Sequence, residues 1–332
     1  MELPYPPRVP LGCFPTRVEP LARMRLRGAD ARDVLIKRDD QTGSDLSGNK
    51  VRKLEFLLAE AQERRSDIVI TCGGIQSNHA RATAVAARRL GMDSVLFLRG
   101  ERPSIADGNV LLDLLVGARI VYITPEAYAD RTRRMADEAG RLAAEGRRPY
   151  LIPEGGSNAL GAWGYVSMLQ ELRDQGLGVD RRCHVFSATG SAGTLAGLEI
   201  GARLLSLAVE PWGVAVCDNE AYFRGRVLEI ASEFARRFGC DAHLRGEEIR
   251  VVEGYRGPGY AMTYPRLLEL IRRLGREEGI LCDPVYTGKA FLAMTDILES
   301  GAIPPEDDVV FVHTGGIFSL FAYRAELFPP GP

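Results

Sequence analysis

Short runs of β-branched and aromatic residues alternate along the chain with longer segments in which apolar residues recur every three or four positions. The short runs predict strands at VLIKR, DIVITC, SVLFL, ARIVYI, PYLI, CHVFSA, GVAVC, IRVV and DVVFVH. Helical spacing is clear in residues 78–90, 127–146, 220–239 and 263–279. Such alternation is typical of parallel sheets with helices on both faces, so the sequence predicts an α/β fold.

One predicted helix begins at a lysine. The polar turn at residues 47–49 precedes Lys50, and apolar residues with helical spacing follow it. A lysine at this position feels the positive end of the helix dipole, and burial would disfavour its ammonium form further. Both effects favour the neutral amine that Schiff-base formation requires. Lys53 is expected to face solvent or to pair with Glu55 or Asp39.

Four polar, glycine-rich stretches directly follow predicted strands. They are CGGIQSNHARA, PEGGSNALGAWG, ATGSAGTLAGL and HTGGIFSLF. Open α/β sheets bind ligands at the carboxyl ends of their strands, so these four stretches predict one site in a crevice.

The third stretch has the character of a phosphate loop. Its small residues let backbone N–H groups turn toward an anion, hydroxyls add donors, and a helix N-terminus adds partial positive charge. It matches neither a Walker loop nor a dinucleotide fingerprint, and a tight turn without a ligand is the alternative. The candidate phosphate ligands are Thr189, Gly190, Ser191, Ala192, Gly193 and Thr194.

The first stretch places an amide, a hydroxyl and a second amide at a helix start, in Gln76, Ser77 and Asn78. This triple suits a substrate carboxylate and a cofactor hydroxyl. Ser77 or Asn78 could instead serve only as the N-cap of the helix that follows.

Composition narrows the class of protein. A hydrophobic fraction of 45% and a net charge of -2 indicate a globular protein and do not suggest nucleic-acid or membrane partners. No signal peptide or membrane span is evident, so we expect a cytoplasmic protein. The cysteines and histidines show no metal-ligand spacing, and no metal is expected. A length of 332 residues favours about two domains.

Eight motifs then point to a family. KRDD, LSGNKVRKLEFL, GGIQSNHARATA, PEGGSNALGAWGY, GSAGTLAGL, GPGYAM, LCDPVYTGKA and FVHTGG occur in this order. Together they resemble the D-cysteine desulfhydrase and 1-aminocyclopropane-1-carboxylate deaminase family of fold-type II pyridoxal-phosphate enzymes. The resemblance implies a tryptophan synthase β-like fold with the cofactor in an interdomain cleft, and a homodimer. It places residues 1–48 and 160–332 in a large cofactor-binding domain and residues 49–159 in a smaller one.

The resemblance also implies how pyridoxal 5'-phosphate is held. Lys50 would carry the cofactor covalently, and Asn78 would bond the hydroxyl of the pyridine ring. The loop at residues 189–194 would hold the phosphate, and Thr314 would approach the pyridine nitrogen.

Substrate contacts follow in the same way. Gln76 and Ser77 would receive the substrate carboxylate, with Asn78 beside them. Tyr260 in GPGYAM and Tyr286 in DPVYTGK match two active-site tyrosines of the family. Lys50 or Tyr286 would remove the α-proton.

The branch of the family is suggested by Thr287, because the deaminase branch usually carries glutamate after the second tyrosine. With Thr287 and Thr314 near the ring nitrogen, the cofactor would be a milder electron sink. Mild activation suits β-elimination, with D-cysteine giving pyruvate, ammonia and sulfide.

Three alternatives remain. One is 1-aminocyclopropane-1-carboxylate deamination, and another is lyase activity on a different β-substituted alanine, such as L-cysteate. Glu154 and Phe318 depart from the residues expected in close relatives and leave this choice and the substrate's handedness open. The third is a cofactor-binding pseudoenzyme, which would be expected to have lost at least one of four residues that are all present: Lys50, Asn78, Tyr286 and Thr314.

Overall fold

The computed structural model describes residues 3–29 and 33–329, which form two sheets. The larger sheet consists of β1 (Val18–Pro20), β2 (Val34–Lys37), β7 (Cys183–Thr189), β8 (Val209–Ala215), β9 (Arg250–Val252) and β10 (Asp308–Val312). The smaller sheet consists of β3 (Ile68–Gly74), β4 (Asp93–Arg99), β5 (Arg119–Ile123) and β6 (Pro149–Leu151). Their strand orders are β1-β2-β10-β7-β8-β9 and β5-β4-β3-β6. All pairs are parallel except β1 with β2, which confirms the predicted fold class.

Helices fill the intervals between strands. The α-helices are α1 (Lys50–Glu63), α2 (Asn78–Arg89), α3 (Gly108–Leu115), α4 (Pro125–Tyr128), α5 (Arg131–Ala144), α6 (Ala159–Asp174), α7 (Gly193–Leu204), α8 (Glu220–Phe238), α9 (Pro265–Glu278), α10 (Thr287–Glu299), α11 (Ile317–Leu320) and α12 (Arg324–Leu327). Short 3₁₀ turns lie at Asp39–Gln41, Glu154–Gly156, Gly246–Glu248 and Phe321–Tyr323. The single helix predicted over 127–146 is divided, because α4 ends before α5 begins. Within the described residues, no helix combines the length and apolar character needed to cross a bilayer.

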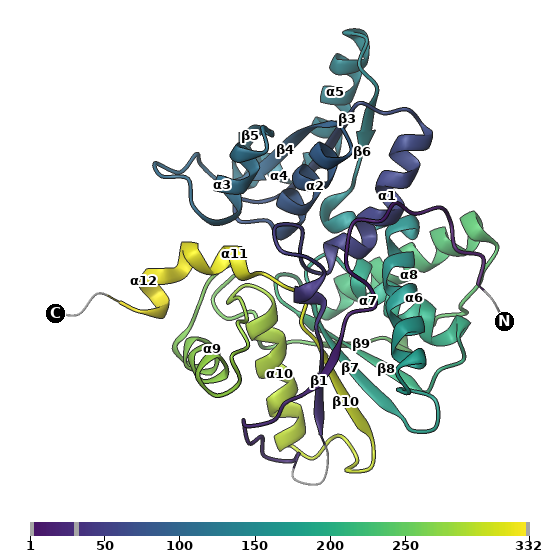
Figure 1. Ribbon diagram of the computed structural model, residues 1–332, viewed down its shortest axis with the longest axis vertical. Helices are drawn as coiled ribbons and strands as arrows, with labels where there is room; N and C mark the ends of the chain where they lie inside the picture. Colours follow the sequence, from purple (N-terminus) through teal and green to yellow (C-terminus); the bar gives the residue numbers. More distant parts are fainter. Residues whose placement is uncertain (1–2, 30–32, 330–332) are drawn as a thin grey trace.

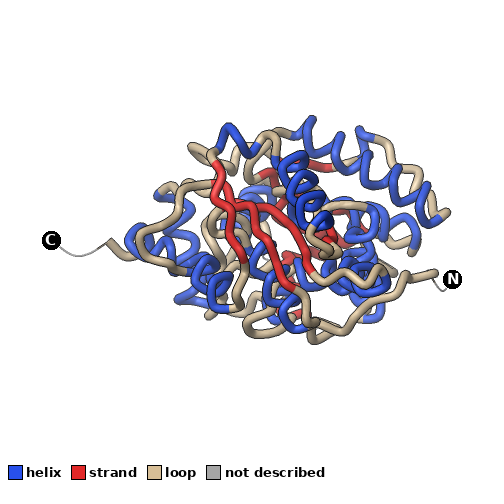
Figure 2. Tube along the Cα trace, turned by 90° about the horizontal axis from the view of Figure 1, so that it is seen from above, coloured by secondary structure: helices blue, strands red, loops and turns tan. Residues whose placement is uncertain are grey.

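The larger sheet is covered on both faces because its side chains alternate between them. Phe186 and Phe311 face α9 and α10, whereas Val185 and Val310 face α6 and α7. Figure 2 shows the strands enclosed by helices in this way.

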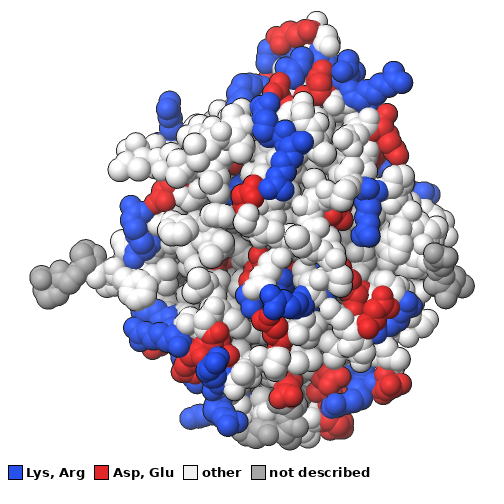
Figure 3. All heavy atoms as spheres, viewed as in Figure 1, with Lys and Arg blue, Asp and Glu red and all other residues white. Residues whose placement is uncertain are grey.

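The side chains of the smaller sheet also alternate between its two faces, and helices cover both. Ile70 and Phe97 pack against α5, and Leu96 and Leu98 pack against α2 and α3. On the face of the molecule in Figure 3, acidic and basic side chains are interspersed.

Helix α1 runs between the two sheets, as Figure 1 shows. Its Leu54 and Leu57 share a core with Val85 of α2 and Trp163 of α6, so α1 is packed against both parts of the molecule. The strands of the smaller sheet all lie within residues 49–159, but the division into two domains at the predicted boundaries stays a prediction.

A buried ion pair fixes the start of α1. The Arg52 guanidinium donates to both carboxylate oxygens of Asp39, at 2.8 and 2.7 Å, and also reaches Glu171 at 2.8 Å. Tyr165 donates its hydroxyl to Asp39 at 2.8 Å. Burial alone would raise the pKa of Asp39, but the Arg52 charge holds it below its usual value. This network positions Lys50, two residues before Arg52.

Candidate active site

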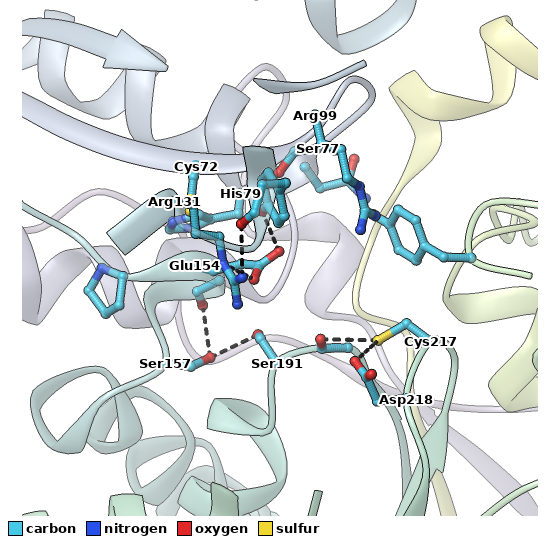
Figure 4. A pocket seen from close by; sticks show the side chains of 18 of the residues that line it. Cys72, Ser77, His79, Arg99, Arg131, Glu154, Ser157, Ser191, Cys217 and Asp218 are labelled. Carbon is cyan, nitrogen blue, oxygen red and sulfur yellow. Dashed lines mark hydrogen bonds and ion pairs between the residues drawn. The ribbon is translucent and has the colours of Figure 1, made fainter. Parts of the chain in front are cut away.

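A cavity of about 860 Å³ lies where carboxyl ends of strands from both sheets meet. This is the crevice that the glycine-rich stretches predict, and its size is that of a small-molecule site. Eight sequence-predicted residues line it: Lys50, Ser77, Asn78, Gly190, Ser191, Tyr260, Tyr286 and Thr314. Five others do not line it: Gln76, Thr189, Ala192, Gly193 and Thr194. Figure 4 shows part of the pocket from close by.

Lys50 is the first residue of α1, at the cavity wall. The backbone N–H of Asn49 donates to the Thr314 carbonyl at 3.1 Å. Gly48 has a φ of +98°, and a Cβ there would lie 2.7 Å from the same carbonyl, so this turn requires glycine. Burial lowers the pKa of Lys50 to about 8, although the carboxylate of Glu154 opposes the shift. The neutral amine is therefore accessible near neutral pH.

Lys53 lies inside the protein, and the expectation that it faces solvent or pairs with Glu55 or Asp39 is wrong. Its side chain is buried because α1 is covered on all sides, and its Nζ donates to the Gly155 carbonyl at 3.2 Å. Glu55 and Asp39 have other partners. Burial and the charge of Lys50 lower the pKa of Lys53 far below its ordinary value.

The glycine-rich loop before α7 lies directly beside Lys53. A Cβ at Gly193 would lie 2.8 Å from Lys53 Nζ and 2.4 Å from Ser157 Oγ. Ser157 Oγ lies 2.8 Å from Ser191 Oγ, and Ala192 has a left-handed φ of +65°. Within the described residues Lys53 has no acidic partner. A buried lysine amine without a counter-ion, next to small residues at a helix start, fits a phosphate group, whose negative charge would favour the ammonium form of Lys53.

The two threonines of this loop do not point their hydroxyls into the cavity. Strand alternation turns Ala188 toward the cavity and Thr189 away from it, beside Gly213 of β8, where its hydroxyl has no partner in the described structure. Thr194 Oγ1 accepts a hydrogen bond from Asn49 Nδ2 at 3.1 Å. The Thr189 hydroxyl, expected to face the phosphate, is thus turned away from the cavity, whereas the role of the backbone from Gly190 to Thr194 stays a prediction.

Of the predicted triple Gln76, Ser77 and Asn78, the last two line the main cavity and Gln76 does not. Ser77 is the N-cap of α2, and Asn78 accepts a hydrogen bond from Asn109 Nδ2 at 3.0 Å. Gln76 is turned toward the start of α3, donating to the Asp107 carbonyl at 3.0 Å and accepting from the Asn109 N–H at 2.8 Å. It lines a neighbouring pocket of about 160 Å³ instead of the main cavity. Ser77 and Asn78 remain available to a substrate.

Two tyrosines face each other in the cavity wall, with the hydroxyls of Tyr260 and Tyr286 2.6 Å apart. Burial raises the pKa of Tyr260 to about 12, and burial together with Tyr260 raises that of Tyr286 further. Asp283 holds Tyr286 in place by accepting its backbone N–H at 3.0 Å. Both phenols are therefore protonated at neutral pH and can act as acids.

Thr287 does not take the position that the sequence interpretation gave it. Its hydroxyl donates to Asp283 Oδ1 at 2.7 Å, because the first residue of α10 lies against the carboxylate that caps this turn. It is fully buried outside the cavity wall. Of Thr287 and Thr314, only Thr314 lines the cavity.

Glu154 and Phe318, the two residues that depart from those expected in close relatives, lie in different places relative to the cavity. Glu154 lines the cavity, accepts the Tyr128 hydroxyl at 2.6 Å and pairs with Arg131 at 3.0 Å, as Figure 4 shows for the labelled side chains. Phe318 lies outside the cavity wall, with the Arg81 guanidinium 4.8 Å from the centre of its ring.

Sequence reasoning missed Asn49, Lys53 and Ser157 as site residues. Asn49 and Ser157 line the cavity, and all three contact or adjoin the loop before α7. The signal for Asn49 and Lys53 was their place beside Lys50 in LSGNKVRKLEFL.

The chain is similar to known proteins over most of its length. The model of the family described as pyridoxal-phosphate dependent enzyme matches residues 9–315. A Thermotoga maritima protein named provisionally as a 1-aminocyclopropane-1-carboxylate deaminase is 43% identical over 325 residues, covering 96% of this chain and 99% of its own. The Arabidopsis thaliana bifunctional D-cysteine desulfhydrase/1-aminocyclopropane-1-carboxylate deaminase is 38% identical over 318 residues, covering 91% of this chain and 77% of its own. A crystal structure of an ACC deaminase homologue superposes with a TM-score of 0.87 at 35% identity, covering 97% and 95% of the two chains.

Proposed function

We propose that this chain catalyses a β-elimination that converts D-cysteine to pyruvate, ammonia and sulfide. The chain belongs to the family of pyridoxal-phosphate dependent enzymes and has their type II fold. The family membership confirms the cofactor predicted from the sequence. The observation that carries the proposal is the pair of protonated tyrosines, Tyr260 and Tyr286, in the same cavity wall as Lys50. A base and an acid are what an elimination needs.

The residues of the cavity fit this cofactor. We assign Lys50 to the covalent bond, Lys53 and the loop before α7 to the phosphate, Asn78 to the ring hydroxyl and Thr314 to the ring nitrogen. When bound, the cofactor accepts the electron pair left on the substrate's α-carbon when its proton is removed. Ser77 and Asn78, at the start of α2, would receive the substrate carboxylate.

The two proton transfers are assigned by acidity. Lys50, with a pKa lowered to about 8 by burial, is the better base for the α-proton. Tyr286, whose pKa burial raises, remains protonated, and its hydroxyl is hydrogen-bonded to that of Tyr260 at 2.6 Å. This pair would protonate the thiolate that leaves the β-carbon. Addition of water to the remaining fragment gives pyruvate and ammonia.

A side-by-side assay tests the reaction. D-cysteine should release sulfide, pyruvate and ammonia, and 3-chloro-D-alanine should release chloride with the same organic products. 1-Aminocyclopropane-1-carboxylate should give little 2-oxobutyrate, because its α-carbon carries no hydrogen and Thr314 offers the ring nitrogen a neutral hydroxyl. Product formation is measured for each compound at equal concentration.

Efficient ring opening with negligible elimination from D-cysteine would overturn the proposed reaction in favour of the deaminase. Binding of all three compounds without any product would instead favour the pseudoenzyme. Parallel assays of L-cysteine and L-cysteate would determine which enantiomer and which β-substituent the enzyme accepts in its substrate.

We also infer a homodimer. Large apolar side chains are exposed on neighbouring elements, with Leu115 of α3 71% exposed and Phe321, which follows α11, 56% exposed. Helices α3 and α11 are in contact, so these side chains lie on one region of the surface. Sedimentation equilibrium should give twice the 36.4 kDa chain mass. A concentration-independent mass of one chain would contradict the dimer.

The cytoplasmic location expected from the sequence stays a prediction.

A further inference from the structure

Arg99 is a cation of the cavity wall that the proposed elimination leaves without a role. It is the last residue of β4, at the edge where ligands bind, and it lines both the main cavity and the neighbouring pocket. The chain turns immediately after it at Gly100, whose φ is +141° and whose Cβ would lie 3.1 Å from Ile75. In Figure 4 the Arg99 side chain extends into the pocket.

The guanidinium of Arg99 lies between two aromatic rings. Its Cζ is 4.6 Å from the centre of the Tyr260 ring and 4.9 Å from that of Tyr128. These contacts place the guanidinium over the two rings, and its N–H groups can still donate to a ligand. The Arg99 guanidinium makes no hydrogen bond or ion pair to a side chain or carbonyl in the part of the chain that the structure describes.

The other charged groups of the cavity wall are accounted for. Arg131 pairs with Glu154 at 3.0 Å, and Arg226 pairs with Glu229. Asp218 is exposed and lies against the thiol of the neighbouring cysteine. Apart from Lys50, Arg99 is thus the cation of the described wall that has no acidic partner.

We propose that Arg99 binds an anionic group at the far end of the substrate's β-substituent, so that the enzyme prefers β-substituted alanines with a negatively charged substituent. The inference rests on the proposed elimination. Tyr260, under the Arg99 guanidinium, belongs to the pair that protonates the leaving group. Arg99 therefore lies on the leaving-group side of the site, where a guanidinium and an oxyanion form charge-assisted hydrogen bonds.

Two substrates that differ by one charge test this assignment. S-carboxymethyl-D-cysteine ends in a carboxylate, and S-carbamoylmethyl-D-cysteine ends in a neutral amide of nearly the same shape. In both, Lys50 takes the α-proton, and the electron pair of that bond ends as a double bond between the α- and β-carbons. The bond from the β-carbon to sulfur breaks, its electron pair goes to sulfur, and sulfur takes a proton from the tyrosine pair. Water then converts the remaining fragment to pyruvate and ammonia, so the reaction balances without any further reactant.

The measurement is the inhibition constant of each compound against turnover of 3-chloro-D-alanine by the holoenzyme. This constant is obtained whether or not the compound itself reacts. The wild type should bind the carboxylate roughly tenfold or more tightly than the amide, since hydrogen bonds to charged groups are the stronger ones. Arg99→Gln should abolish the preference, and Arg99→Lys should retain part of it.

Arg226→Gln is the matched control, because Arg226 lines the same cavity but already has an acidic partner. It should keep the wild-type preference. If Arg99 only supports the rings of Tyr260 and Tyr128, Arg99→Gln will weaken both compounds equally, and the proposal is overturned. The absence of a preference in the wild type would overturn it as well.

A second readout does not depend on turnover. Calorimetry on the Lys50→Ala variant should show the same preference for the carboxylate, and its loss in the Lys50→Ala/Arg99→Gln double variant. Failure of 3-chloro-D-alanine to react, with this binding preference intact, would reject the proposed elimination and keep Arg99 as an anion site. Turnover of 3-chloro-D-alanine without a preference for the carboxylate would keep the proposed elimination and reject Arg99 as an anion site.

Discussion

Lys50→Ala should abolish turnover, lowering kcat by about 10³-fold or more, while the protein keeps part of its affinity for pyridoxal phosphate. The amine of Lys50 is the proposed covalent attachment point and the proposed base, so its removal takes away two functions at once. The phosphate site beside Lys53 and Gly193 is untouched by this substitution. Steady-state assay and equilibrium dialysis with the cofactor measure the two effects separately.

The acidity of Lys50 adds a pH dependence to this prediction. With its pKa lowered to about 8 by burial, roughly a tenth of the amine is neutral at pH 7, and most is neutral at pH 9. Only the neutral form attacks a carbonyl. Covalent uptake of the cofactor by the cofactor-free wild type, followed by its visible absorbance, should therefore accelerate from pH 7 to pH 9. Lys50→Ala should show no such change.

Lys53→Met serves as the control for a general effect of losing a buried lysine. It should lower cofactor affinity, because the phosphate loses its cation, but turnover should persist once the cofactor is saturating. Full activity in Lys50→Ala would reject Lys50 as the catalytic lysine.

Much of the fold could be predicted because strands here have simple local signatures. All nine predicted runs contain strands, since a buried parallel strand reads as a short β-branched run. Helix α6 was not predicted from its spacing. Its residues are buried on almost every side between α1, α7 and α8, so it lacks the polar stripe that marks a surface helix. Strand β1, three residues long, gave no pattern at all.

The site could be predicted at the level of segments and less well at the level of atoms. Every glycine-rich stretch named from the sequence contributes to the cavity wall, because each follows a strand that ends there. Which side chains point inward depends on strand parity and on local capping. Thr189 is turned away by its place in β7, and Gln76 and Thr287 are held by α3 and by Asp283. Arg99 was not predicted as a site residue, since its two tyrosine neighbours are distant from it in the sequence.

Gly193→Asp should weaken cofactor binding by about a hundredfold or more. Even the Cβ of a replacement would lie 2.4 Å from Ser157 Oγ, so Ser157 and its contact with Ser191 must shift. The added carboxylate would also lie next to Lys53 Nζ, which is 2.8 Å from that Cβ, and would take the cation that the phosphate needs. Equilibrium dialysis of the cofactor against wild type and variant measures the loss.

Steric disruption and charge can be separated with two further variants. Gly193→Ala introduces the crowding alone and should weaken binding less than Gly193→Asp, because it leaves Lys53 without a competing anion. Gly140→Asp adds the same charge on α5, where a Cβ would have nothing within 4 Å, and should leave cofactor affinity unchanged. Circular dichroism of the cofactor-free proteins establishes that all three variants are folded. If folded Gly193→Asp binds the cofactor as tightly as the wild type, the loop before α7 is only a turn, and the phosphate must be held elsewhere in the cavity.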